Sequence, residues 1–318
     1  MQPMQVEEVL ACLPRDKTRF HYHRDRYVLY LLERLHRRGE LRTVRDVKRS
    51  RYARWLERPL LKPWLAEAGR DDLPLDELAL RWPVQEAAGL SYVLTAGRWG
   101  EALWDPWYQT SRPGQNVVLQ LNLPSSHARV FEACGVEQVW RLRRHLHPLS
   151  EARMTLAWAR LDWDWASGQA MIEEIQSDWL RDFPLMLAQA RTVQGWGEEM
   201  LYWHGRYVPV RAVLDYAPKL EAHRALWSEA MLTAALQFLL EEMGLREVFY
   251  HSWRTGNAVK RLEGDACPPQ SLYRELPERF CFERVARGPE FLEHDPKVKK
   301  VKRRLSDGSD WRWYRWAA

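Results

Sequence analysis

The first ninety residues carry apolar side chains at the spacing of helices. Residues 27–38 have apolar positions on one helical face, and Gly39 follows as a stop signal. A second helix is expected over residues 44–58, ending near Pro59, and a short third helix over residues 60–67. We therefore predict that residues 1–90 form a helical module.

Beyond residue 90 the pattern changes to that of strands. Residues 90–95 and 116–123 are rich in β-forming residues and are separated by a turn-forming stretch at 111–114. A helix near residues 126–133 and a strand near residues 136–142 are expected next. Residues 154–165 and 169–176, joined by a short turn, then predict an antiparallel hairpin.

The C-terminal pattern predicts helices alternating with strands. An apolar face runs along residues 226–243, and Gly244 ends this long helix. A strand over residues 246–253, a helix over 255–262 and a strand over 280–285 are expected after it. The prediction is an α+β fold: the N-terminal helical module, followed by an α+β domain of mixed sheet over residues 91–318.

Charge and tryptophan are unevenly distributed along the 318 residues, whose net charge is +5. Basic side chains crowd residues 34–58 and again residues 297–304, which favours a polyanionic partner, either nucleic acid or a phosphate-bearing cofactor. The chain has 18 tryptophans, most of them expected in the core. The basic, tryptophan-rich tail at 297–318 either docks on the core or stacks on bases.

Several classes of protein are disfavoured by absent motifs. No apolar stretch approaches the roughly 18 residues of a membrane span, and no signal peptide is recognisable, so we expect a cytoplasmic protein without membrane contact. There is no Walker loop, GxGxxG or HExxH motif, which argues against nucleotide-dependent phosphoryl transfer and zinc proteolysis. The pairs His21/His23 and His145/His147 lack a third ligand, so no metal site is predicted from them.

A dense polar group ends the second strand of the predicted hairpin, formed by Glu173, Glu174, Gln176, Ser177 and Asp178. Because side chains alternate along a strand, at least one of the two glutamates points to a packed face. A buried carboxylate without a partner has a raised pKa, as a general base requires. In the alternative interpretation one glutamate pairs with an arginine across the sheet, and Ser177 and Asp178 cap the next helix.

The string IEEIQSDW at residues 172–179 resembles a domain of large polyvalent proteins of phages and mobile elements. Trp227, Gly244, Thr255-Gly256 and the LYRELP run at 272–277 extend the resemblance, which covers residues 154 to about 285. It implies no settled activity. It does imply an accessory protein of a phage or mobile element that acts by binding a partner.

The order of hairpin, long helix, strand and helix is similar to that of GCN5-related acetyltransferases. This resemblance implies acyl-CoA as the cofactor, with Glu173 or Glu174 as the general base and Tyr273 as the acid that protonates the departing thiolate. Splayed backbone amides hold the pantetheine in that family. Lys219 and Arg224 would supply positive charge in place of the family's glycine loop, which this sequence lacks. The substrate and cofactor contacts that we expect are Gln176, Ser177, Asp178, Trp179, Lys219, Arg224, Trp227, Thr255 and Asn257.

Other assignments of function are left open by the sequence. Asp162 and Asp164 could join the two glutamates around Mg²⁺ or Mn²⁺. Ser177, Asp178 and His251 offer the residue types of nucleophilic catalysis, without a nucleophile-elbow motif. The rival to any enzyme is a nucleic-acid-binding or partner-binding protein, in which arginine-rich helices contact phosphates and the terminal tryptophans stack on bases.

Overall fold

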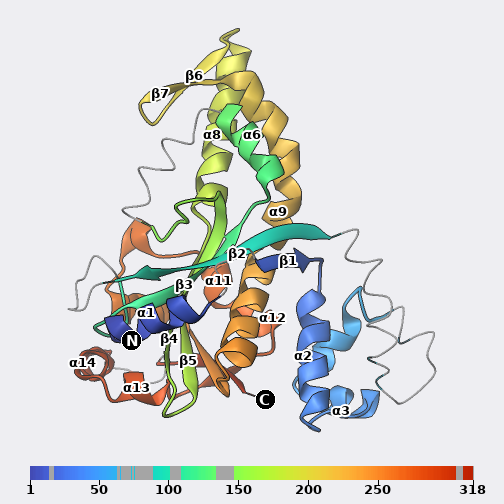
Figure 1. Cartoon of the computed structure of the whole chain (residues 1–318), viewed down its shortest axis with the longest axis vertical. Helices are drawn as coiled ribbons and strands as arrows, with labels where there is room; N and C mark the ends of the chain where they lie inside the picture. Colours follow the sequence, from blue (N-terminus) through green and yellow to red (C-terminus); the bar gives the residue numbers. More distant parts are fainter. Residues whose placement is uncertain are drawn as a thin grey trace.

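The computed structural model describes residues 1–13, 18–62, 65, 73, 75, 89–100, 109–133, 147–305 and 311–317. An eight-stranded mixed sheet crosses the molecule, with helices packed around it (Figure 1). The α+β class is therefore confirmed. Along the sheet the strands are β1 (Thr18–Tyr22), β2 (Leu90–Trp99), β3 (Asn116–Asn122), β4 (Thr155–Asp164), β5 (Gln169–Gln176), β8 (Glu247–His251), β10 (Trp313–Ala317) and β9 (Glu283–Val285).

One parallel pair interrupts an otherwise antiparallel sheet. Strands β5 and β8 run parallel, which requires a long crossover connection. Their pairing ends at Ile172 and Tyr250, whereas β5 continues to Gln176. The two strands therefore diverge at this point, and the candidate residues Glu173 and Glu174 lie just past it.

The crossover forms an arm that stands out from the sheet, at the top of Figure 1. It consists of α8 (Asp178–Gly195), the two-stranded sheet of β6 (Met200–Trp203) and β7 (Arg206–Pro209), and α9 (Val210–Gln237). His204 and Gly205 both have positive φ, which is the geometry of a two-residue hairpin turn. A π-helical turn, η3 (Phe238–Glu242), then leads back to β8.

The N-terminal helices form as expected, but the segment is not purely helical. Helix α2 (Arg26–Arg37) confirms the first predicted helix. The second expected helix is divided at Ser50 into α3 (Val44–Arg49) and the short η1 (Ala53–Glu57). Helix α1 (Pro3–Cys12) precedes them, and β1 pairs with β2 along its whole length, so part of the predicted module belongs to the sheet.

The strand predictions agree closely with β2, β3 and the β4–β5 hairpin, and α6 (Ser125–Ala133) matches the helix expected near 126–133. The strand expected at 136–142 lies outside the described residues, as does half of the helix expected at 60–67. Among the described helices, none has the length and apolar character needed to cross a bilayer.

The C-terminal segment is not a free tail. Helices α10 (Trp253–Lys260), α11 (Gln270–Tyr273), α12 (Glu275–Arg279), α13 (Glu290–Glu293) and α14 (Pro296–Arg304) lead to β10, which lies between β8 and β9. Trp311, Trp313 and Trp316 are almost completely buried. Of the two alternatives for these tryptophans, docking on the core is confirmed, and stacking on bases is wrong because their rings already fill the core.

We expect Trp313→Ala to lower the free energy of unfolding by about 3–5 kcal/mol, the usual cost of removing a buried aromatic side chain. Trp313 stacks on His251 at 4.9 Å, and a Cβ at Gly288 would come within 2.5 Å of its ring. Chemical denaturation measures the effect. Trp165→Ala is the control, because Trp165 is 46% exposed. An equal loss of unfolding free energy in the two variants would contradict the burial of Trp313.

Candidate functional site

The two adjacent glutamates of β5 are both buried, as are the other residues of this strand from Gln169 to Ile175, because both faces of the sheet are covered here. Arg160 of β4 lies opposite Glu174, and the next residue, Leu161, lies opposite Ile172. Glu173 is therefore the extra residue of a β-bulge and has no partner on β4. Within this covered strand, Glu173 is 0% and Glu174 is 5% exposed.

Glu174 is neutralised by two buried cations. It forms an ion pair with Arg160 across the hairpin, and Lys260 of α10 places its Nζ 3.7 Å from the same carboxylate oxygen. Burial pushes the pKa of Glu174 upward, but the charges of Arg160 and Lys260 outweigh it, so the pKa lies below its ordinary value. The alternative interpretation, a glutamate paired with an arginine across the sheet, is thus confirmed.

Glu173 is held by the loop that precedes β3. The Ser111 hydroxyl donates to Oε2 at 2.6 Å, and the Ser111 backbone N–H donates to Oε1 at 3.2 Å. His251 Nε2 lies 3.3 Å from Oε2, and Lys260 donates to the Glu173 backbone carbonyl at 2.5 Å. Against the effect of burial, His251 and Lys260 hold the pKa of Glu173 well below its ordinary value.

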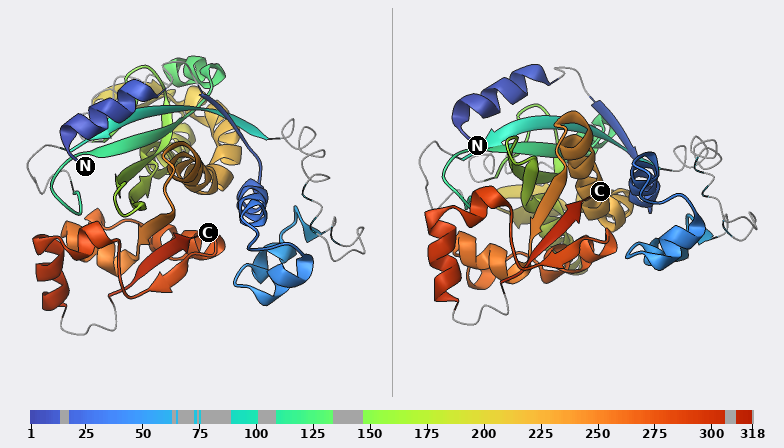
Figure 2. Two further views of the ribbon diagram at one scale, coloured as in Figure 1. Left: turned by 60° about the horizontal axis from the view of Figure 1, so that its bottom comes forward. Right: turned by 90° about the horizontal axis from the view of Figure 1, so that it is seen from below.

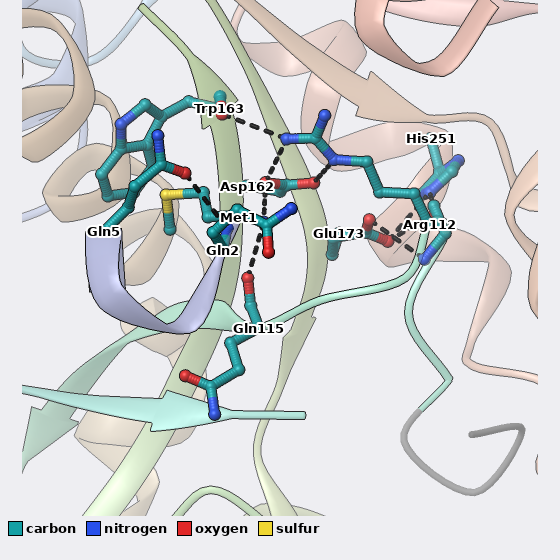
Figure 3. A network of polar contacts seen from close by, with 10 residues as sticks. Met1, Gln2, Gln5, Arg112, Gln115, Asp162, Trp163, Glu173 and His251 are labelled. Atoms are coloured by element: carbon teal, nitrogen blue, oxygen red, sulfur yellow. Dashed lines mark hydrogen bonds and ion pairs between the residues drawn. The ribbon is translucent and has the colours of Figure 1, made fainter. Parts of the chain in front are cut away.

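His251 does not complete a nucleophilic triad. Burial lowers its pKa to about 4, so the ring is neutral at pH 7. The same nitrogen, Nε2, faces both Ser111 Oγ at 2.8 Å and Glu173, whereas a triad uses one ring nitrogen for the nucleophile and the other for the carboxylate. Figure 3 shows His251 directed at Glu173, close to Arg112.

Tyr273 joins this group from α11. Its ring stacks on Tyr250 with the centroids 5.2 Å apart, and Lys260 Nζ lies 6.0 Å from its centroid. Burial and the nearby charge of Glu174 raise the pKa of Tyr273 well above its ordinary value. The fold thus brings together all three residues predicted as catalytic. We refer to the following set as the buried charge cluster: Ser111, Arg160, Glu173, Glu174, His251, Lys260 and Tyr273.

Ser177 and Asp178, at the start of α8, cap this helix and hold it against β4. Ser177 is the N-cap, accepting from the Leu180 N–H at 3.2 Å and donating to the Leu156 carbonyl at 2.5 Å. Asp178 accepts from Trp158 Nε1 at 2.9 Å and from Gln176. The expected capping role is confirmed for Ser177, which accounts for its hydroxyl without any nucleophilic function.

The other expected ligand contacts do not join the buried charge cluster in a common cleft. Trp179 is buried against Phe183 and Tyr216. On α9, Lys219 and Arg224 are exposed and Trp227 is half-buried. On α10, the Thr255 hydroxyl donates to the Arg312 carbonyl at 2.8 Å, and Asn257 is buried.

The four carboxylates proposed for a divalent cation are also separated by their partners. Arg112 donates to both oxygens of Asp162, at 2.6 and 2.8 Å, and the Met1 amine adds a contact of 2.9 Å (Figure 3). Asp164 instead accepts from the Ser167 N–H in the hairpin turn. Within the described part of the chain, no three acidic, histidine or cysteine side chains gather as a metal site would require.

Two surface cavities in the described part of the chain do not reach the buried charge cluster. A groove of about 420 Å³ runs between α8 and α9, and another of about 690 Å³ lies beside β9 and α13. Neither is lined by Glu173, Glu174 or Tyr273. The residues of the cluster are themselves buried, at the point where β5 and β8 diverge.

A different feature lies on the surface of the N-terminal helices. Residues 34–62 contain eleven lysines and arginines against three acidic residues. Helix α3 buries Val44 and Val47, which leaves Arg45, Lys48 and Arg49 exposed. We define the basic module surface as the exposed cations of this segment: Arg37, Arg38, Arg42, Arg45, Lys48, Arg49, Arg51, Arg54 and Lys62.

The basic module surface is held rigidly against the core. Tyr27 stacks on Phe280 with the centroids 4.0 Å apart, and Trp55 Nε1 donates to the Arg279 carbonyl at 3.2 Å. Arg34 pairs with Glu241 at 2.7 Å. These contacts fix α2 and η1 to the C-terminal half, so the exposed cations keep a defined arrangement.

A second group of cations lies on α14. Val298 is buried, whereas Lys299, Lys300, Arg303 and Arg304 are exposed. Lys297 turns inward and donates to the Thr110 carbonyl at 3.0 Å, and burial lowers its pKa to about 8. Figure 2 shows α14 and α3 on opposite sides of the molecule, so the two basic groups form separate surfaces.

Comparisons with protein-family models, curated proteins and solved structures find no match for this chain. The two resemblances noted in the sequence therefore stay predictions.

We expect Glu174→Gln to lower the free energy of unfolding by about 3–5 kcal/mol, because it leaves Arg160 and Lys260 buried without their anion. Urea denaturation at pH 7 measures this loss. The control is Glu33→Gln, since Glu33 pairs with Arg37 on the surface and both side chains are 57% exposed. An unchanged denaturation midpoint in Glu174→Gln would rule out a structural role for this carboxylate.

Stability should fall as the pH is lowered from about 6.5 to 4. Burial lowers the pKa of both His251 and His223 in the folded protein to about 4, whereas the pKa of an unfolded histidine is about 6.5. Between these two values the unfolded chain binds protons that the folded protein does not, so lowering the pH reduces the free energy of unfolding. His223→Gln should reduce the slope by up to about 1.4 kcal/mol per pH unit. A free energy of unfolding that stays constant between pH 6.5 and 4 would contradict the lowered pKa values of the two histidines.

Proposed function

We propose that the protein binds nucleic acid through the phosphate backbone, using the basic module surface. The observation that carries the proposal is the excess of eleven cations over three anions in residues 34–62, nine of those cations being exposed. Phosphate contacts by lysine and arginine supply most of the affinity in sequence-independent nucleic-acid binding. A rigidly held cationic surface also keeps the entropic cost of binding low.

Several of these exposed cations have partners within the chain: Arg51 pairs with Glu283, and Arg54 donates to the Glu278 carbonyl. Asp46 is used in the capping box of α3, where it accepts from the Thr43 and Arg42 N–H groups. The pairs Arg37–Glu33, Arg38–Glu40 and Lys62–Glu57 are exposed. Exposed pairs contribute only about 0–1 kcal/mol, so phosphate can replace the carboxylates readily.

Binding of this kind should be insensitive to base sequence. Tyr52 and Trp55, the aromatic residues of the α3–η1 region, are buried, and the C-terminal tryptophans are buried as well. No stacking platform thus accompanies the described cations, and recognition would rest on charge and shape.

The affinity for a labelled oligonucleotide should fall steeply with salt, and the triple variant Arg45→Glu, Lys48→Glu, Arg49→Glu should weaken it at least tenfold. Fluorescence anisotropy between 50 and 200 mM salt measures both effects. The matched control reverses three exposed charges on α9, at Arg211, Lys219 and Arg224. Absence of binding at low salt, or equal weakening by both triple variants, would refute the proposal.

Acyl transfer is a second candidate, favoured by the divergence of β5 and β8 and by the gathering of Glu173, Glu174 and Tyr273 there. The lowered pKa of both glutamates weighs against it, because a general base works best with a pKa near the working pH. Lys260 also already donates to the Glu173 carbonyl beside the divergence. Lys219 and Arg224 do not form an anion site with the cluster.

Tyr273→Phe distinguishes this candidate from a purely structural cluster. The Tyr273 hydroxyl is buried and has no hydrogen-bond partner among the described residues, so its removal should change stability by less than about 1 kcal/mol. If Tyr273 is the acid, the variant loses thiol release from acetyl-CoA while keeping its melting temperature. Absence of any acetyl-CoA-dependent thermal shift or thiol release in the unmodified protein would reject acyl transfer.

A further inference from the structure

The exposed face of α14 carries positive charges only. Residues 296–305 contain six lysines and arginines and no acidic residue. Four of these cations are exposed, and none of the four has an ion pair or a hydrogen bond with another described residue. We call them the α14 surface: Lys299, Lys300, Arg303 and Arg304. Several cations of the basic module surface have a carboxylate partner that phosphate must displace, whereas the α14 surface has none among the described residues.

The helical period places these four cations opposite the face of α14 that packs on the protein. Val298, Val301 and Leu305 recur at helical spacing, and all three contact the same cluster of buried apolar side chains. Lys302 lies beside this apolar face, where it pairs with Glu293 at 3.0 Å. The packing and the ion pair fix α14 in place, so the α14 surface keeps one orientation.

Two pairs of cations within the α14 surface repel each other. Lys299 and Arg303 are four residues apart, as are Lys300 and Arg304, and like charges at this spacing destabilise a helix. The helix dipole compensates only the cations of the last turn, which Lys299 and Lys300 precede. Asp295 does not neutralise them, because it is used as the N-cap of the helix. An anion that lies along this face relieves the repulsion in both pairs.

Nucleic acid fits the α14 surface better than a membrane or a protein does. A helix that binds a membrane surface turns an apolar face toward the acyl chains, and a protein interface has an apolar centre. The apolar face of α14 is turned toward the core instead, and none of the exposed large apolar side chains of the described residues lies beyond residue 207. The α14 surface offers positive charge alone, which complements the phosphate backbone of a duplex.

One short duplex cannot contact the α14 surface and the basic module surface together. The two surfaces lie on opposite sides of the molecule (Figure 2). A compact chain of 318 residues has a radius of gyration of about 20 Å, whereas a DNA duplex stays nearly straight over its persistence length of about 500 Å. A duplex bound on one side therefore runs past the molecule and leaves the other side open for a second duplex.

We propose that the α14 surface holds a second nucleic-acid duplex while the basic module surface holds the first, so that one copy of the protein bridges two duplexes. This inference rests on the proposed function, since the first duplex is the one that the basic module surface binds. It adds a second binding site, formed by different residues, and a stoichiometry of two duplexes for each chain.

Capture of a second duplex tests the bridge. A duplex of about 20 base pairs is attached sparsely to beads, loaded with the full chain at about 50 mM salt and offered a fluorescent duplex of unrelated sequence. The loaded beads should capture the fluorescent duplex. The triple variant Lys299→Glu, Lys300→Glu, Arg303→Glu should still load onto the beads but capture at least tenfold less. The matched control reverses the three exposed charges on α9, at Arg211, Lys219 and Arg224, and should capture as much as the unmodified protein.

Sedimentation velocity with an excess of duplex gives the stoichiometry independently. The unmodified protein should sediment as one chain with two duplexes, and the α14 triple variant as one chain with one duplex. A single duplex on the unmodified chain, lost in Arg45→Glu, Lys48→Glu, Arg49→Glu, would overturn the bridge and leave the proposed function standing. Absence of any binding at low salt would overturn both. Binding to vesicles of anionic lipid that depends on α14, without capture of a second duplex, would also overturn the bridge.

Discussion

The neutralisation of two neighbouring buried carboxylates is the constraint on which the centre of this structure depends. Removing even one carboxylate from water is costly unless cations and hydrogen bonds compensate for the lost hydration. Arg160 and Lys260 provide the charges for Glu174, and Ser111 and His251 provide the contacts for Glu173. These partners come from β4, α10, the loop before β3 and β8, so the cluster ties together elements that are distant in the sequence.

The local elements of this fold could be predicted because their sequences carry strong periodic patterns. Residues 27–38 follow a helical period that ends at Gly39, and the β4–β5 hairpin follows from two apolar runs joined by a short turn. Strand β10 could not be recognised, because its alternation of tryptophan with arginine, next to a highly basic helix, resembles an exposed binding tail. Its burial depends on β8 and β9, which lie far away in the sequence.

In the candidate site, too, the sequence predicts what depends on neighbouring residues but not the contacts between distant segments. Alternation predicts that at least one of the two glutamates is buried. Both are buried because β5 is covered on both faces, which the local pattern does not show. Ser111 and Lys260 carry no motif and reach the glutamates through tertiary contacts alone. A buried acidic pair does indicate that basic partners must exist. The sequence cannot identify which of its 48 lysines and arginines they are.

The order of the strands also constrains how the chain can be completed during synthesis. Strand β9 pairs with β10 alone, and β10 occupies the position between β9 and β8. On a translating ribosome, β9 thus has no neighbour in the sheet until residues 313–317 have left the exit tunnel. Until then the outer edge of β8 stays open to pairing with other chains, which favours aggregation of the nascent protein.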